Sequence, residues 1–118
     1  MSYYHEPPEE LGEQARNITR ALNSLKEEVE AVDWYNQRAV TTNDDHLKNI
    51  VEHNRDEEIE HACMTLEWLR QNVPAWDEHL RTYLFTGRDV TKVEEEEENG
   101  NDASKASGGS DLGIGKLS

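Results

Sequence analysis

Residues 11–32 read LGEQARNITRALNSLKEEVEAV, and this stretch decides the fold class. Its apolar side chains recur at alternating spacings of four and three residues: Leu11, Ala15, Ile18, Leu22, Leu25, Val29 and Val32. An α-helix has about 3.6 residues per turn, so this spacing gathers the apolar residues along one side. The pattern predicts a long amphipathic helix, over about residues 9–40, that packs against another helix.

A second stretch without helix breakers follows at about residues 44–73. The polar run at 41–45, TTNDD, predicts a turn and an N-cap, and Pro74 predicts the end of this second helix. A short third helix is expected over about residues 75–86, with Gly87 as its C-cap. We therefore predict an all-α chain: an antiparallel two-helix hairpin plus a short third helix.

The charge balance limits the classes of partner. The chain has 118 residues, with 12 Lys and Arg against 26 Asp and Glu, and a formal net charge of -14. Nucleic-acid binding needs a basic face, so this charge argues against that class and favours cations. Hydrophobic residues make up 34% of the sequence, which is too few for a large core within one chain. Burial through oligomerisation is therefore expected.

Cysteine content and hydropathy indicate the cellular setting. A single cysteine excludes an intrachain disulfide framework and a cysteine-based zinc site. No apolar run approaches the roughly 18 residues that a membrane span needs, so no membrane partner is expected. The N-terminus MSYYHEPPEE lacks the basic start and apolar run of a signal peptide. These features predict a soluble protein of the reducing cytosol.

Candidate metal ligands lie in the middle of the second helix. Glu58 lies within about 20° of Val51 and Leu69 around the helix, on the face expected to be buried. A buried carboxylate is costly unless it is paired or binds a metal. His61 follows three residues later, so both side chains can reach one ion. This Glu-x-x-His spacing is typical of di-iron carboxylate bundles.

The first helix supplies a matching carboxylate. Glu28 lies at the edge of the apolar stripe, three residues after Leu25 and four before Val32. An antiparallel hairpin with its turn near residue 43 places Glu28 and Glu58 at similar heights. One chain then offers half of a di-iron ligand set, and two chains complete it. The sequence thus predicts dimerisation into a ferritin-like four-helix bundle.

Simpler interpretations remain open for these residues. His61 can bond Glu58 or Glu57 within one helix, as a buried polar pair that fixes helix register. His53 and Glu57 are four residues apart and are expected to form a surface pair. Tyr35 lies about 20° from Glu28 around the helix, either beside the metal or as a core aromatic. An outer group on the first helix suits a solvated face: Glu27, Glu30 and Trp34.

The composition changes after Val93. Five glutamates, Glu94 to Glu98, precede the polar Gly/Ser-rich run NGNDASKASGGS, so residues 94–110 are predicted to be a disordered linker. A small apolar island, LGIGKL, follows within residues 111–118. Its apolar side chains alternate with small or polar ones, so it could dock in extended form onto a partner.

Several motifs together resemble the encapsulated ferritins, the ferritin-like proteins packaged inside prokaryotic encapsulin shells. The resemblance covers nearly the whole chain and rests on five motifs: EEVEAVDWYNQR at 27–38, HNRDEEIEH at 53–61, MTLEWLR at 64–70, HLRTYLFT at 79–86 and LGIG at 112–115.

The resemblance implies an annular homodecamer, a pentamer of dimers, with a ferroxidase centre between two chains. Iron would be held by three residues of each chain: Glu28, Glu58 and His61. Tyr35 would lie beside this centre. A route by which metal reaches it would be marked by Glu27, Glu30 and Trp34. Calcium is a further candidate at secondary sites.

The resemblance also assigns the parts of the chain. Residues 1–93 would be the helical hairpin domain, 94–110 the linker, and 111–118 the cargo-loading peptide that docks inside the encapsulin shell. The expected location is the shell lumen in the prokaryotic cytoplasm.

The predicted function is therefore a ferroxidase that converts Fe(II) to Fe(III) for storage in the shell. The first rival is a non-catalytic acidic helical adaptor. A di-iron enzyme acting on an organic substrate is disfavoured, because so short a chain offers no evident apolar pocket.

Overall fold

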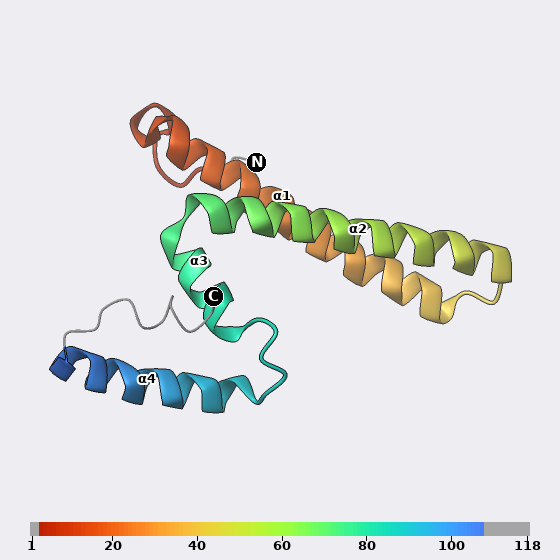
Figure 1. The fold of residues 1–118 in the computed structure, drawn as a ribbon. Helices are drawn as coiled ribbons and strands as arrows, with labels where there is room; N and C mark the ends of the chain where they lie inside the picture. The colour runs from red at the N-terminus through yellow and green to blue at the C-terminus, as the bar shows by residue number, and fades with distance from the viewer. Residues whose placement is uncertain (1–2, 108–118) are drawn as a thin grey trace. The chain divides into compact units, whose positions relative to one another are not determined.

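The computed structural model describes residues 3–107, and the regular structure within this range is helical (Figure 1). The helices are α1 (Pro8–Thr41), α2 (Asp45–Asn72), α3 (Pro74–Tyr83) and α4 (Val90–Ser107). The predicted all-α fold class is confirmed. Within the described range, no helix combines the length and apolar character needed to cross a membrane.

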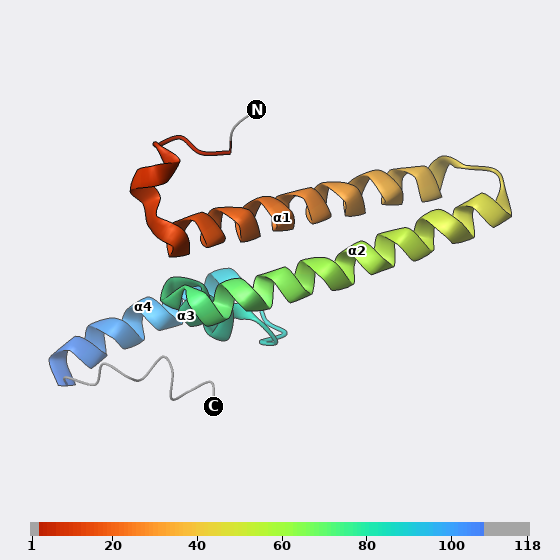
Figure 2. The same ribbon diagram turned by 90° about the horizontal axis from the view of Figure 1, so that it is seen from above.

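Helices α1 and α2 form the predicted antiparallel hairpin, and the two views show them side by side (Figures 1 and 2). Pro8 occupies the first helical position of α1, where its missing N–H costs no helical hydrogen bond. At the turn, the Asp44 carboxylate accepts a hydrogen bond of 2.8 Å from the backbone N–H of Leu47. This N-cap confirms the turn predicted at residues 41–45 and starts α2 at Asp45.

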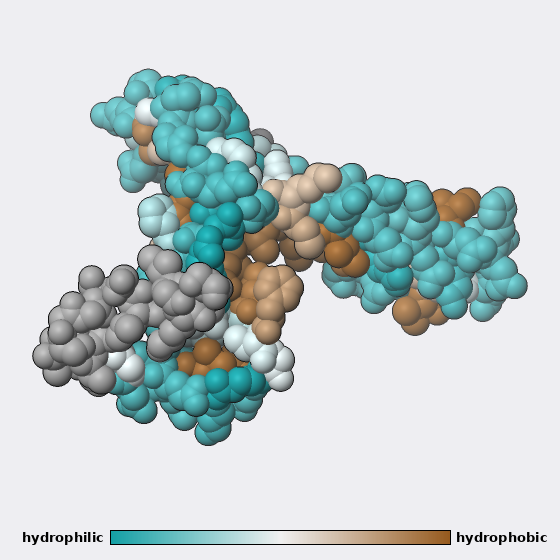
Figure 3. Space-filling view, in the orientation of Figure 1, coloured by the Kyte–Doolittle hydropathy of each residue, from teal (hydrophilic) through white to brown (hydrophobic). Residues whose placement is uncertain are grey.

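The chain divides into two compact units, Met1–Leu69 and Arg70–Ser118. In the first unit the fully shielded apolar residues are few: Ala39, Val51 and Leu69. Many apolar side chains on α1 and α2 stay exposed instead, among them Leu22, Val29, Leu47, Ile50, Ile59 and Met64. Figure 3 shows brown apolar patches near the hairpin turn within a mostly hydrophilic surface. One hairpin therefore covers only part of its own apolar face.

The second unit is organised around α3 and α4, which pack against each other. Asp77 on α3 forms ion pairs with two arginines. The Arg81 guanidinium is 2.8 Å from its carboxylate, and the second partner is Arg70. Among the residues of this unit whose side chains are described, 70–100, Val93 on α4 is the buried apolar one. These contacts tie the last residues of α2 to α3.

Backbone details differ from the sequence prediction at two glycines. Gly12 was expected within a continuous helix, but its φ of 81° and ψ of 165° kink α1 there. Gly87 is not the C-cap of α3, because the helix ends earlier and Leu84 caps it in an extended conformation. The left-handed turn that follows is made by Phe85 and Gly87, both with φ of 64°. Local spacing does not reveal which residue takes this conformation.

Helix α4 also differs from expectation, since the sequence predicted a disordered linker from Glu94 onward. Glutamate has a high helix propensity, and two basic residues offset part of the acidic charge. Arg88 pairs with Glu96 at 2.7 Å, and Lys92 pairs with Glu95 at 3.7 Å. The role of this segment as a tether stays a prediction, and the apolar island at 111–118 lies outside the described residues.

Candidate metal centre

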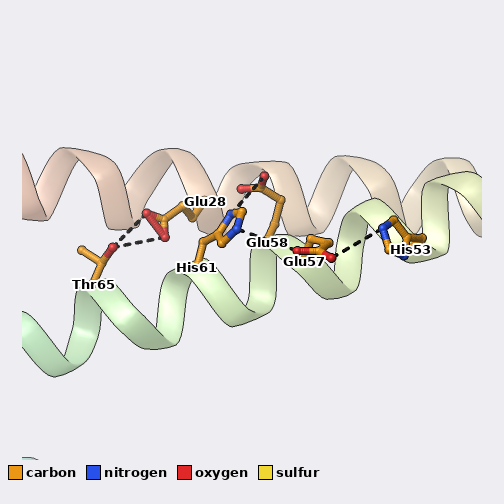
Figure 4. Close-up of polar contacts among 6 residues, drawn as sticks. All are labelled: Glu28, His53, Glu57, Glu58, His61 and Thr65. Atoms are coloured by element: carbon orange, nitrogen blue, oxygen red, sulfur yellow. Dashed lines mark hydrogen bonds and ion pairs between the residues drawn. The ribbon is translucent and has the colours of Figure 1, made fainter.

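Glu58 and His61 lie one turn apart on α2, as the Glu-x-x-His spacing predicts (Figure 4). His61 Nδ1 is 3.7 Å from Glu58 Oε1, which is longer than a hydrogen bond. The side chain of Glu58 is 28% exposed and that of His61 is 48% exposed. The pair is therefore half-covered in the single chain, and neither group is held tightly by the other.

Glu28 on α1 reaches across to α2. The Thr65 hydroxyl donates a hydrogen bond to Glu28 Oε1 at 3.0 Å and lies 3.3 Å from Oε2. Figure 4 shows the Glu28 carboxylate turned toward Thr65. His61 and then Glu58 follow further along the hairpin. The carboxylate from α1 therefore contacts α2 at Thr65, seven residues beyond Glu58, and its predicted position at the height of Glu58 stays a prediction.

A second group of ligand-type side chains lies on the exposed face of α2. Glu57, Glu60 and His61 each place a ligand atom within 4.8 Å of the others. His61 Nε2 is 3.9 Å from Glu57 Oε2, and His53 Nε2 is 3.5 Å from Glu57 Oε1. The predicted surface pair of His53 and Glu57 is confirmed. Glu60 is not among the predicted ligands, although its position three residues after Glu57 places both on one face of the helix.

The structure does not bring the whole predicted ligand set together within one chain. In the described range, the group within 4.8 Å is the exposed one, and it leaves out Glu28 and Glu58. A centre made of Glu28, Glu58 and His61 needs a second chain to contribute the same residues. This ligand set therefore stays a prediction.

The other candidates lie along α1. Tyr35 is half-buried, and the Arg38 guanidinium lies over its ring at 5.4 Å from the centroid. Glu27 is exposed and accepts a hydrogen bond of 3.3 Å from the Tyr3 hydroxyl. Trp34 is exposed and Glu30 is half-buried. Their roles stay predictions, and calcium at secondary sites gains no support from these contacts.

Carboxylates and an imidazole on paired antiparallel helices are the ligand groups that ferritin-like carboxylate proteins use. Residues 3–87 match the family model described as EncFtn-like, and the chain belongs to this family.

Relatives extend this similarity over nearly the full length. The chain is 60% identical to a "Ferritin-like protein" of Thermotoga maritima, over 97% of this chain and 96% of the relative. It is 53% identical to an "Encapsulated ferritin-like protein" of Rhodospirillum rubrum, over 96% and 86%. A solved structure, protein ne0167 from Nitrosomonas europaea, is 52% identical with a TM-score of 0.73. The alignment covers 75% of this chain and 99% of that one.

Proposed function

We propose that this protein is a ferroxidase whose substrate is Fe(II), at a di-iron centre formed between two subunits. The observation that carries the proposal is the pair Glu58 and His61 on α2, with Glu28 reaching in from α1. The membership in the EncFtn-like family supports iron handling as the general role.

The donor set suits the chemistry of iron oxidation. Carboxylate oxygens favour the harder and more highly charged Fe(III), while imidazole keeps affinity for Fe(II). Two Fe(II) ions give up one electron each, and dioxygen takes both electrons with two protons to form hydrogen peroxide. Peroxide is an alternative oxidant that can accept electrons in the same way. In this proposal Glu28, Glu58 and His61 hold the ions, and Tyr35 acts beside them.

Two copies of the chain are needed for this centre. Each hairpin supplies half of a di-iron ligand set, and its exposed apolar residues on α1 and α2 offer a surface for association. Repulsion among the facing carboxylates weakens the metal-free interface, so bound cations favour assembly. The annular decamer that the resemblance implies extends the same pairing.

The product iron passes to an encapsulin shell. The name of the Rhodospirillum rubrum relative indicates encapsulation, and residues 111–118 are the proposed docking peptide. The protein then works in the lumen of a nanocompartment in the prokaryotic cytoplasm. Glu27, Glu30 and Trp34 mark the proposed route for incoming Fe(II), because negative potential concentrates cations.

Substitution of the ligands tests the ferroxidase proposal. Glu58→Ala and His61→Ala are each expected to lower the rate of aerobic Fe(II) oxidation at least about 10-fold, because a missing ligand weakens metal binding. Both variants should stay helical in circular dichroism, since the lost side chains are half-exposed. The matched controls on the same helix are Glu52→Ala and His46→Ala, which should oxidise Fe(II) like the wild type.

The same assay separates the rival function. A non-catalytic helical adaptor would leave Fe(II) oxidation at the rate of the protein-free solution. Wild-type rates in both ligand variants would contradict the assignment of the centre.

A further inference from the structure

We infer that Thr65 is a positioning residue for Glu28, an inference that rests on the proposed function. The Thr65 hydroxyl donates to Glu28 Oε1 at 3.0 Å, and Oε2 is 3.3 Å away. The two residues are 37 positions apart in sequence, so this bond ties a carboxylate of α1 to the facing helix. Figure 4 shows both side chains between the two helices.

Two other helical threonines of the chain bond a different kind of partner. A threonine hydroxyl within a helix commonly bonds the backbone carbonyl of the preceding turn. Thr41 does so with the carbonyl of Gln37 at 3.0 Å, and Thr82 with that of Glu78 at 3.0 Å. Thr65 instead directs its hydroxyl to a carboxylate of another helix. Helix geometry alone does not explain this partner. A role in orienting Glu28, a proposed metal ligand, does explain it.

The hydrogen bond fixes the carboxylate without using up its capacity to bind metal. A glutamate side chain has several rotamers, and holding it in one before metal arrives removes an entropic cost of binding. A hydroxyl has one proton, so it occupies one of about four lone-pair positions on the carboxylate. The remaining positions stay available to an ion. A hydrogen bond to a charged group at a half-buried site is also stronger than one between neutral groups.

Packing does not explain the hydroxyl. Thr65 is half-buried and borders a surface hollow of about 320 Å³. The other residues around the hollow are Arg20, Ala21, Ser24, Met64 and Trp68. Replacing the hydroxyl by a methyl group of similar size therefore changes hydrogen bonding far more than volume.

The test compares Thr65→Val, which removes the donor, with Thr65→Ser, which keeps it. Thr41→Val removes a hydroxyl elsewhere on the hairpin and serves as the control. Two quantities are measured: the dissociation constant for Co(II), which air does not oxidise, and the KM and kcat for Fe(II) oxidation. For T65V we expect the Co(II) dissociation constant and the KM to rise about 10- to 100-fold, with kcat changed less than about twofold. T65S and T41V should match the wild type.

A double variant shows whether Thr65 acts through Glu28. In the Glu28→Ala background, T65V should weaken Co(II) binding no further, because the group it positions is gone. Equal Co(II) binding by T65V and the wild type would overturn the inference, as would a T65S variant as weak as T65V. If T65V loses helicity in circular dichroism, Thr65→Ala removes the same hydroxyl with less bulk and the same outcomes apply.

The Co(II) measurement also keeps the two proposals apart. A wild-type protein that binds Co(II) but leaves Fe(II) unoxidised overturns the proposed ferroxidase, while the Co(II) series still decides the role of Thr65. A wild-type protein that binds no Co(II) overturns both.

Discussion

The His61 imidazole lies between two carboxylates on the same helix. Nδ1 is 3.7 Å from Glu58, and Nε2 is 3.9 Å from Glu57. Neither distance is short enough for a hydrogen bond, so either nitrogen can supply the lone pair that binds a metal. The two carboxylates lie on different faces of α2. Glu58 is on the half-covered face, and Glu57 is on the exposed face. We propose that iron oxidation takes place on the face of α2 that carries Glu58, because Glu28 of α1 reaches α2 on that face.

Asp77 provides a pH-dependent contribution to stability at the residue scale. Hydrogen bonds from Arg81 and Arg70 hold the pKa of the Asp77 carboxyl below its usual 3.8. Because this pKa is lower in the folded chain than in the unfolded one, the charged form stabilises the fold above about pH 4. That contribution is lost as the pH falls through the folded-state pKa.

We expect Asp77→Asn to be less sensitive to acid than the wild type. The measurement is the urea midpoint of unfolding at about pH 6 and about pH 3. The wild type should lose more stability between these values than D77N does. Glu78→Gln, which neutralises an exposed neighbour on α3, is the control and should behave like the wild type. An equal acid loss in D77N and the wild type would show that the arginine pairs do not stabilise this unit.

The individual ligand candidates could be predicted from spacing, but their partners could not. Helical periodicity placed Glu58 and His61 one turn apart and brought Glu28 to the facing helix. The hydrogen bond between Glu28 and Thr65 depends on the register of two helices at the level of single side chains. A sequence pattern does not determine that register, so the contact with Thr65 could not be predicted.

Gly12 determines the shape of α1 at the element scale. Its φ of 81° and ψ of 165° lie in a region that is essentially restricted to glycine. A Cβ at this position would meet nothing within 4 Å, so a substitution would cause backbone strain and no clash. The kink turns the first residues of the chain, and Tyr3 bonds Glu27.

Gly12→Ala is therefore expected to destabilise the bent N-terminal turn by about 1–3 kcal/mol. The backbone amides of residues 9–11 should then exchange with deuterium roughly 5- to 150-fold faster, as this energy range implies. Ser24→Ala, in the straight part of α1, is the control. Unchanged protection at residues 9–11 would mean that another conformation relieves the strain without opening the turn.

The elements follow from the sequence where the periodicity is long. Alternating apolar spacings predicted α1 and its partner α2, and the acidic turn predicted where α2 begins. The prediction failed at the end of α3, because the conformation of Leu84 and Phe85 is not encoded in local spacing. Over α4, low hydrophobicity indicated disorder while helix propensity favoured a helix. Composition alone therefore could not predict whether this segment is helical or disordered.

Across the whole molecule, iron oxidation and binding to the shell are proposed to belong to different parts of the chain. The helical body is proposed to oxidise iron, and residues 111–118 are proposed to bind the encapsulin shell. Deleting 111–118 should leave Fe(II) oxidation in solution unchanged, because no proposed ligand lies there. The deletion should also prevent co-purification with the shell protein when the two are expressed together. Packaging that persists would place the address in the helical body instead.

The exposed apolar surface of the hairpin is the whole-molecule feature that connects fold and function. Unpartnered side chains such as Leu22, Val29 and Ile59 lie on the same two helices as the ligands. Burying them between two chains would also bring two half-sets of ligands together. The central claim is therefore that iron is bound by two chains at once.

The most direct test is a crystal structure of the protein grown with Fe(II), with anomalous diffraction recorded at the iron absorption edge. We expect two iron peaks between two chains, each within bonding distance of Glu28, Glu58 or His61. Iron found only beside Glu57 and Glu60 of single chains, or no iron peak between chains, would contradict it.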